Sequence, residues 1–444
     1  MRRAAQVVAM ALLALIALAS VMSPPRTAHA QEDDERTINV RVQNRLEGEN
    51  TPVPGVTITV SAGGEEVASA ETNENGLAEL VVQGRRDYEI TVDRDTLPDD
   101  VDIPEERASL VITSGQFTSS RIARTFNTGE AASTTEPFVD KLAQRLVDGT
   151  RFGLLIAISS VGLSLVFGTT RLTNFAHAEM VTFGGVVAFL FNVTGISFLG
   201  FMPFVDDRGR MHLILAAVIT TIIGGLFGLF LNGTLFGVLR RRGYSLITLM
   251  VISVGLSIAL KNVFLHRFRS RRRPYNDYAS QSAWEIGPVS ITPRDLIVAV
   301  ISLVVLITVA LTLQRTRLGK ATRAVSDNLA LASATGINSE RIIRVVWFSG
   351  GALAALGGIF NGLDEQVSFE MGAQLLFVMF AGITLGGLGS AFGALLGGFI
   401  VGLFVELATF VVPSELKNAP ALIVLILVLL VRPQGILGRA ERVG

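Results

Sequence analysis

The chain has 444 residues, half of them hydrophobic, and a mean hydropathy of +0.50, which favours a membrane protein over two or three soluble domains. Its 38 Lys and Arg residues balance 38 Asp and Glu residues, so no overall basic charge points to nucleic acid as a partner. Cysteine is absent and the four histidines are scattered, which excludes disulfides and thiolate sites and leaves no metal-ligand spacing.

The first 30 residues have the layout of a secretory signal peptide. Arg2 and Arg3 precede a short apolar run, Val7–Val21, and the small-residue tripeptide Ala28–Ala30 follows. We therefore expect cleavage after Ala30 and export of the residues that come next, while a retained membrane anchor is the alternative.

Residues 31–130 show the two-residue periodicity of β-strands. Short β-branched runs alternate with turn signals such as Asn73–Gly76, and the runs are INVRV, VTITV, LAELVV, YEITV and SLVIT. This spacing predicts a small all-β, antiparallel sandwich outside the membrane. The stretch from PVPGVTITV through YEITVD to TLP resembles the carboxypeptidase-regulatory and Cna-B-like family of exported prealbumin-type sandwiches. We expect a spacer or docking module, followed at residues 131–148 by a linker and the helical lead into the first span.

Residues 149–444 predict an all-α polytopic membrane domain with about eight to nine transmembrane helices. Several apolar runs are shorter than the roughly 20 residues of a perpendicular span, so one segment can be re-entrant. The predicted spans are Gly149–Phe167, Met180–Leu199, Leu213–Leu239, Leu246–Leu265, Asp295–Leu313, Ile342–Leu363, Leu375–Leu388, Gly393–Val412 and Ala421–Val431.

A polar segment, Leu318–Ser339, separates two of these spans and predicts one short helix ended by Gly336. The basic residues within or beside it are Arg315, Arg317, Lys320, Arg323, Arg341 and Arg344. The positive-inside bias places the segment in the cytoplasm. The basic clusters at 240–242 and 432–439 then fall on the same side. If the amino terminus is outside, only the loop HRFRSRRRP falls on the unexpected side, so either the span count is off by one or function holds that loop there.

Glycines recur at four-residue spacing in the last predicted spans. Gly389, Gly393 and Gly397 form the longest such run, and this spacing lets two helix backbones approach closely in lipid. We therefore predict that these three glycines pack helices together and have no direct contact with a solute.

Three groups of polar residues interrupt the apolar spans and are candidates for a translocation pathway. A charge in hydrocarbon costs a few kcal/mol unless it faces a cavity or a partner. The candidates are Asn174, His177 and Glu179 in the stretch NFAHAE, Asn262 beside Lys261, and Glu406 between apolar neighbours. The alternative for NFAHAE is an interfacial helix cap whose polar groups are satisfied by backbone and headgroups.

Sequence motifs for catalysis are missing. The chain has no HExxH and no GxSxG, and Gly319-Lys320 is followed by Ala321 and lacks the leading glycine of a P-loop. We therefore expect no enzymatic activity, no bound ATP and no cofactor in this chain.

Four motifs, in the same order, resemble the LIV type of ABC importer permease, the branched-chain amino acid family. They are GLSLVFGTTRLTNFAHAE, LGKATRAVSDNLALASATGIN, GGLGSAFGALLGGFIVG and VLLVRPQGILGR, and the resemblance covers residues 142–441. It implies a subunit in the plasma membrane that pairs with a second permease to form a heterodimer. It also implies two cytoplasmic ATPase subunits and an extracytoplasmic solute-binding protein as partners, with the lipid bilayer as surroundings.

In that family the polar segment corresponds to the coupling helix that seats on an ATPase. Ala332, Gly336 and Ile337 match its EAA…G loop, although Ala330 stands at the position of the acidic residue. The pattern NFAHG(E) of the family is NFAHAE here, with Ala178 in place of a glycine.

Arg323 and Asp327 are our candidates for polar contacts to the ATPase, because they lie four apart on one helical face.

Three hypotheses for function follow from these observations. The first is ATP-driven, alternating-access import of branched-chain or similar aliphatic amino acids. The second is import of another small polar solute, such as urea or a short amide, by the same machinery. The third is an envelope adhesion or signalling protein whose membrane part serves as an anchor.

Overall fold

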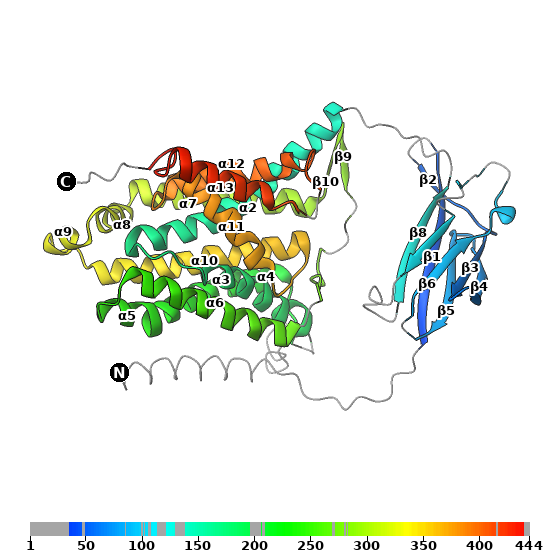
Figure 1. Ribbon diagram of the computed structural model, residues 1–444, viewed down its shortest axis with the longest axis horizontal. Coiled ribbons are helices and arrows are strands. Elements are labelled where there is room, and N and C mark those ends of the chain that lie inside the picture. The colour runs from blue at the N-terminus through cyan, green and yellow to red at the C-terminus, as the bar shows by residue number, and fades with distance from the viewer. Residues whose placement is uncertain are drawn as a thin grey trace. The chain divides into compact units, whose positions relative to one another are not determined.

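The computed structural model describes residues 35–438, except 47–48, 85, 99–100, 102, 105–107, 113–120, 129–137, 196–205, 207–208, 269–270, 279–280, 282 and 414–415. The chain forms two compact units that divide at Phe138, one of β-strands and one of helices (Figure 1). The predicted signal peptide and the first part of the predicted linker lie outside the described residues.

The β unit is a sandwich of two four-stranded sheets. One sheet has the order β2-β1-β5 with β8 also paired to β1, and the other has the order β4-β3-β6-β7. The strands are β1 (Glu35–Leu46), β2 (Glu49–Pro52), β3 (Thr57–Ala62), β4 (Glu65–Glu71), β5 (Leu77–Gln83), β6 (Tyr88–Val92), β7 (Ser109–Ile112) and β8 (Arg121–Thr128).

Alternating side chains form the core of this sandwich, as the two-residue periodicity predicts. In β6, for example, Tyr88, Ile90 and Val92 are buried while the residues between them are exposed. The Tyr88 hydroxyl donates a hydrogen bond of 2.5 Å to the carbonyl of Gln83, so its polar end is satisfied at the edge of the core. The predicted two-residue periodicity thus appears as alternating burial in β3, β5 and β6.

One detail of the predicted sandwich is wrong. The β1–β8 pair is parallel, with Thr37 opposite Arg121, so the sheet is mixed and not purely antiparallel. The turn signal at Asn73–Gly76 does correspond to a turn, which connects β4 of one sheet to β5 of the other. The Asn73 carboxamide oxygen accepts hydrogen bonds from the backbone of Asn75 and Leu77, and this turn carries the chain across the sandwich.

The helical unit has seven helices long and apolar enough to cross a membrane, and two shorter apolar helices, among the described residues. Its helices are α2 (Phe138–Thr170), α3 (His177–Phe189) with the π-helical segment η4 (Leu190–Thr194), α4 (Leu213–Leu231) with η6 (Asn232–Phe236) and α5 (Gly237–Arg241), α6 (Leu246–Phe268), α7 (Pro293–Arg315), α8 (Arg317–Asp327), α9 (Leu329–Ala334), α10 (Ser339–Glu365), α11 (Met371–Gly386), α12 (Ala391–Ala408) and α13 (Ala419–Val431).

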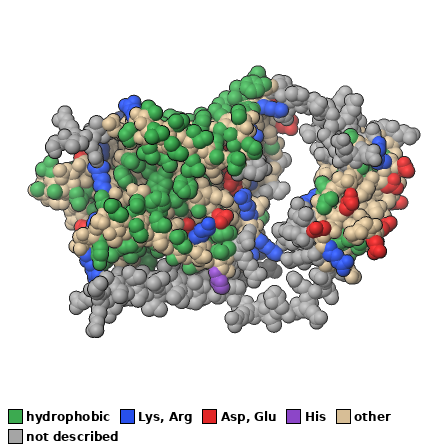
Figure 2. Space-filling model, in the orientation of Figure 1, with side chains coloured by type: hydrophobic (Ala, Val, Ile, Leu, Met, Phe, Trp, Pro, Cys, Tyr) green, Lys and Arg blue, Asp and Glu red, His purple; other side chains and the backbone are tan. Residues whose placement is uncertain are grey.

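Each predicted span corresponds to one helix or helical run, but the bounds differ. The first helix, α2, begins at Phe138, 11 residues before the predicted span, and so absorbs the predicted helical lead. A small hairpin of β9 (Trp284–Ile286) and β10 (Val289–Ile291) precedes α7 and was not predicted. Figure 2 shows a broad band of hydrophobic side chains over the helices, as expected of a surface in contact with lipid.

The two ends of the helical unit are distinct. Helices α5, α8 and α9 lie at one end and the β9–β10 hairpin at the other (Figure 1). The basic loop that follows α6 lies at the hairpin end, because Arg273 pairs through its backbone with Val367, just after α10. The Tyr275 hydroxyl also donates to the carbonyl of Gly185 in α3. This loop is therefore folded against the helices, opposite α8 and α9.

Helix α10 is the centre of the packing, and glycines bring its backbone against three neighbours. A Cβ atom on Gly358 would collide with the carbonyl oxygen of Val181 in α3. Cβ atoms on Gly351 and Gly350 would meet the carbonyl oxygens of Gly224 in α4 and Gly162 in α2. Such close approach maximises van der Waals contact between helices. This matters in lipid, where the hydrophobic effect does not drive helices together.

The glycine run predicted to pack helices does so. On α12, a Cβ atom on Gly393 or Gly397 would collide with the backbone of Gly386 or Gly382 in α11. Gly389 has φ +81° in the turn between these helices and lies against Gly168 near the end of α2. The seam therefore needs glycine for space at two positions and for backbone conformation at the third.

We predict that Gly358→Ala strongly destabilises the helical unit, whereas Gly255→Ala does not. Gly358 has no room for a methyl group against Val181, and overpacking costs about 1–3 kcal/mol or more. Gly255 lies mid-helix in α6, and the position that a Cβ atom would take there has no neighbouring atom within 4 Å, so alanine should be neutral or slightly stabilising. Thermal denaturation of the two variants in detergent measures the difference, and equal midpoints would contradict the close-packing argument.

Candidate functional site

The polar segment between α7 and α10 forms two short helices, α8 and α9, where one helix was predicted. Asn328 separates them with an extended backbone, and its side chain accepts a hydrogen bond from the backbone of Leu331 to cap α9. Thr316 caps α8 in the same way through Gly319. Ser, Thr and Asn favour such N-caps, so Asn328 is the residue that divides the segment.

Gly336 ends α9 in a Schellman motif. Its backbone N–H donates to the carbonyl of Ser333, and the N–H of Ile337 donates to the carbonyl of Ala332. Gly336 has φ +86° and open space around it, so conformation rather than room requires glycine here. The prediction that Gly336 ends a helix is confirmed.

Polar and apolar groups share the exposed face of this segment. Arg323 and Asp327 are exposed on α8, as their four-residue spacing predicts, while Leu329 and Leu331 are exposed on α9. Leu329 is 42% and Leu331 62% exposed on a helix outside the apolar spans, and together they form an apolar surface beside charged residues of the kind that contacts another protein. Sequence reasoning missed both leucines because leucine on a short helix ordinarily signals burial. Ala332, by contrast, lies on the buried face of α9.

The underside of α8 meets the ends of two spans. Gly319 packs against the backbone of Leu313 at the end of α7. Ser326 lies against Gly168 near the end of α2, and the Arg171 guanidinium donates a 3.4 Å hydrogen bond to the Ser326 carbonyl. Arg171 itself has φ +57°, in the turn that leaves α2. The segment is therefore connected directly to the junction between α2 and α3.

That junction is a buried break in the helical structure. Helix α2 ends at Thr170 and α3 begins at His177, and the chain between them is not helical although Asn174 is fully buried. The Ser253 hydroxyl of α6 accepts a hydrogen bond of 3.1 Å from the backbone of Phe175. Non-helical backbone at membrane depth persists only where protein covers it or where it lines a polar cavity.

The structure brings together the three predicted pathway residues of NFAHAE, all fully buried at this break. The His177 Nε2 atom lies 3.1 Å from the carbonyl oxygen of Ser159 in α2. The Glu179 Oε1 atom accepts a hydrogen bond of 3.2 Å from the Ser257 hydroxyl of α6. Asn174 Nδ2, His177 Nδ1 and Glu179 Oε2 have no hydrogen-bond partner among the described residues. The arrangement is a buried cluster with spare donors and acceptors.

The other two predicted pathway residues lie elsewhere. Asn262 is exposed on α6, and its amide donates to the carbonyl of Ile258 in its own helix. Glu406 is buried at the end of α12, where it forms ion pairs with Lys417 and Arg145. Neither contacts Glu179 in the described hydrogen bonds or ion pairs.

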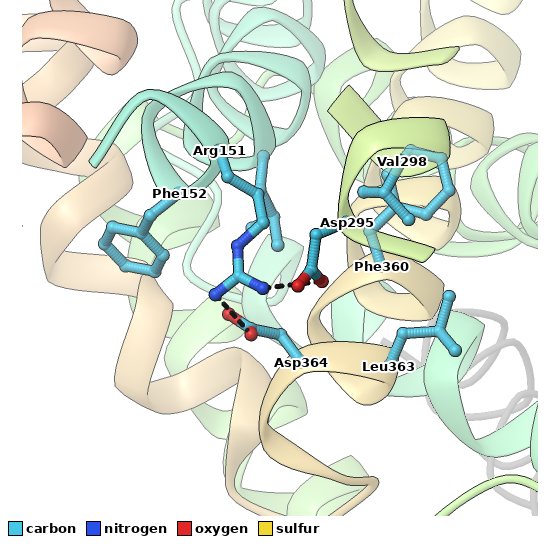
Figure 3. Close-up of a pocket in the computed structure, with 8 residues that line it drawn as sticks. Arg151, Phe152, Asp295, Val298, Phe360, Leu363 and Asp364 are labelled. Carbon is cyan, nitrogen blue, oxygen red and sulfur yellow. Dashed lines mark ion pairs between the residues drawn. The ribbon is translucent and has the colours of Figure 1, made fainter. Parts of the chain in front are cut away.

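Glu406 belongs to an ion network at the end of the unit opposite α8 and α9. In this network the Arg151 guanidinium of α2 lies between Asp295 of α7 and Asp364 of α10, at 2.7 Å from each, beside a small apolar pocket (Figure 3). Both pairs are more than two-thirds buried. The network therefore ties the middle of α2 to the start of α7 and the end of α10, which are distant in sequence.

Lys417, in the turn before α13, extends this network to α12. Its ammonium pairs with Glu406 and lies 3.6 Å from Glu365, next to Asp364 in α10. It also lies 4.5 Å from the centre of the Phe152 ring. Burial alone would lower the pKa of Lys417, but the Glu406 and Glu365 carboxylates outweigh it and raise the pKa above its usual value. Lys417 therefore stays charged at neutral pH.

We predict that Arg151→Met destabilises the helical unit by about 3 kcal/mol, because it leaves two partly buried carboxylates without their counter-charge. Arg145→Met is the control, since the Arg145 side chain is 43% exposed and lies 3.8 Å from Glu406. The denaturation midpoint in detergent should fall by about 5 °C or more for the first variant and barely change for the second. If Arg151→Met denatures at the wild-type temperature, the network does not hold these helices together.

The comparisons with known proteins agree with the geometry. Residues 145–431 match the family model described as branched-chain amino acid transport system, permease component. The chain is 31% identical over 312 residues to the high-affinity branched-chain amino acid transport system permease protein BraD of Pseudomonas aeruginosa, a match that covers 69% of this chain and 98% of that protein.

Further relatives include two proteins of Escherichia coli. The corresponding permease protein LivH of Escherichia coli is 28% identical, over 67% of this chain and 96% of its own length. The galactofuranose transporter permease protein YtfT of the same organism is 25% identical, over 63% and 76%. No solved structure matched.

Proposed function

The chain belongs to the family of permease components of branched-chain amino acid transport systems, and on this premise we propose that it moves branched-chain or similar aliphatic amino acids into the cell. It is the multi-pass membrane subunit of an ABC transporter and not the subunit that hydrolyses ATP. The observation that carries the proposal is the junction of α8 and α9 with the break before α3.

The α8–α9 segment has the properties of a docking site for an ATPase. It is exposed, it combines charged Arg323 and Asp327 with exposed Leu329 and Leu331, and two caps and a Schellman motif fix its shape. A rigid helical surface with apolar anchors fits a groove on a partner protein. Movement of the segment would act on α2 and α7 through Ser326 and Gly319.

A permease of this family implies ATPase and binding-protein partners. We propose two ATPase subunits on the side of α8 and α9, which is then the cytoplasm, and a second permease subunit that completes a heterodimer. On this orientation α2 begins outside, so the β sandwich is extracytoplasmic and the sequence before it acts as a signal peptide. Alternating access then requires the ion network at the external end to rearrange when that end opens.

Purified complex in proteoliposomes tests the solute class. The complex should contain this chain, its ATPase subunits, the second permease and the binding protein, and we expect ATP-dependent uptake of leucine, isoleucine and valine. Urea, short amides and galactofuranose are the competing solutes, because motifs of this kind are shared among permeases for different solutes. Uptake of one of these without leucine uptake would refute the amino acid proposal, and failure of an ATPase to co-purify would favour an envelope anchor.

We predict that Gly336→Val uncouples transport whereas Gly336→Asn does not. Valine disfavours the left-handed backbone at φ +86°, with a cost of about 1–2 kcal/mol, whereas asparagine tolerates it. Leucine uptake by Gly336→Val should fall to about a tenth or less at normal protein levels and normal binding-protein affinity, with Gly336→Asn above about half. Wild-type uptake by the valine variant would contradict a coupling role for α9.

Sidedness gives a separate prediction, and the absence of native cysteine makes it direct to measure. Cysteine at Ala330 in α9 should react with a membrane-impermeant maleimide only in inside-out vesicles. Cysteine at Glu285 in the β9–β10 hairpin should react only in right-side-out vesicles, since both residues are exposed at opposite ends of the unit. The reverse pattern would invert the proposed topology.

A further inference from the structure

We propose that Glu179 and Lys261 form a subsite for the zwitterionic backbone of an amino acid, in which the solute ammonium binds Glu179 and the solute carboxylate binds Lys261. This inference rests on the proposed import function and deepens it, because it says what the pathway recognises. It starts from two oppositely charged side chains on neighbouring helices, α3 and α6, that do not form an ion pair with each other among the described contacts.

Glu179 is the more unusual of the two charges. It is fully buried in the first turn of α3, where the helix dipole favours a carboxylate by about 0.3–1 kcal/mol. Translocon-based scales put an acidic residue at the centre of a span at about 2.5–3.5 kcal/mol, so the dipole alone does not account for it. One oxygen accepts the Ser257 hydroxyl, and the other has no hydrogen-bond partner among the described residues. A second, cationic partner is therefore the missing element of this position.

Lys261 is placed to serve the same site. It follows Ser257 by one helical turn, so both side chains lie on the same side of α6, the side on which Ser257 contacts Glu179 of α3. Its ammonium lies 3.0 Å from a carboxylate oxygen of Glu370, just before α11, and 5.5 Å from the centre of the Phe369 ring. Both partners of this ion pair are partly exposed, so the pair can open without leaving a charge buried.

The geometry assigns a role to Glu370 as well. In the absence of solute its carboxylate occupies the position beside Lys261 that the solute carboxylate would take. When an amino acid binds, its ammonium compensates Glu179 and its carboxylate replaces Glu370 at Lys261. With the amino acid bound, Glu179 and Lys261 each have a counter-charge on the solute and Glu370 keeps its partly exposed position. A neutral solute such as urea or a sugar does not provide these two counter-charges.

The test uses the complete transporter in proteoliposomes, with two charge-removing variants, Glu179→Gln and Lys261→Gln. Each should lower leucine uptake by about tenfold or more, as expected for loss of a charge-assisted hydrogen bond to the solute. Binding-protein-stimulated ATP hydrolysis should remain, which shows that coupling is intact. Lys141→Gln and Glu285→Gln are the control variants, because they remove charges of the same sign from exposed positions outside the proposed subsite.

Charge-conserving substitution separates recognition from packing. Lys261→Arg should recover most of the uptake lost in Lys261→Gln, because it retains a cation for the solute carboxylate. A thermal-shift measurement on the complex without binding protein gives a direct readout. Leucine should raise the denaturation midpoint of the wild type but not of either Gln variant, and neither leucinamide nor 4-methylpentanoate, each lacking one charge, should stabilise the wild type.

The results distinguish the two proposals. Wild-type leucine uptake together with near-normal uptake by either Gln variant, or failure of Lys261→Arg to rescue, would overturn the subsite and leave the import function standing. Uptake of urea or a sugar in place of leucine by the wild-type complex would refute the import proposal itself, and the subsite with it.

Discussion

Backbone-to-backbone contact at α10 is the constraint on which the helical unit depends. Gly350, Gly351 and Gly358 set this helix directly against α2, α4 and α3, and no side chain intervenes at those points. Dispersion between closely packed atoms, and not exclusion of water, then holds the helices together in lipid. Because the three contacts lie on one helix, a change in the position of α10 requires all three neighbouring helices to adjust.

The charges of the helical unit follow from this packing. The glycine contacts leave no space for a side chain where α10 meets its neighbours, and its acidic residues lie at its two ends, with Asp364 and Glu365 in the ion network and Glu340 paired with Arg240. In the network, Arg151 and Lys417 compensate four carboxylates drawn from α7, α10 and α12. Glu179 is the exception, since it lies at the break before α3 with one oxygen unpartnered among the described residues. A buried charge without a counter-charge says more about function than a network in which every charge is compensated.

The sequence predicted the parts of the structure that depend on local pattern. Apolar runs located every membrane-spanning helix, alternation located the strands of the sandwich, and Gly336 correctly ended α9. What it could not predict depends on tertiary contact. Asn328 divides the polar segment by a side-chain cap, β8 pairs with β1 over a distance in sequence of more than 80 residues, and Glu406 owes its environment to Lys417. Residues that looked alike in the sequence, Asn174 and Asn262, differ because one lies in a buried break and the other on an exposed face.

The hydrogen bond from Arg171 to the Ser326 carbonyl can transmit movement between two parts of the helical unit. It links α8 to the short non-helical stretch that precedes Glu179, so a push on α8 reaches that carboxylate along fewer than ten residues of chain. This connection is short and ends at the non-helical stretch between α2 and α3, which can change its backbone conformation without breaking an α-helical hydrogen bond. A displacement of α8 would therefore be transmitted first to the buried carboxylate of Glu179, before it reaches the glycine-packed helices.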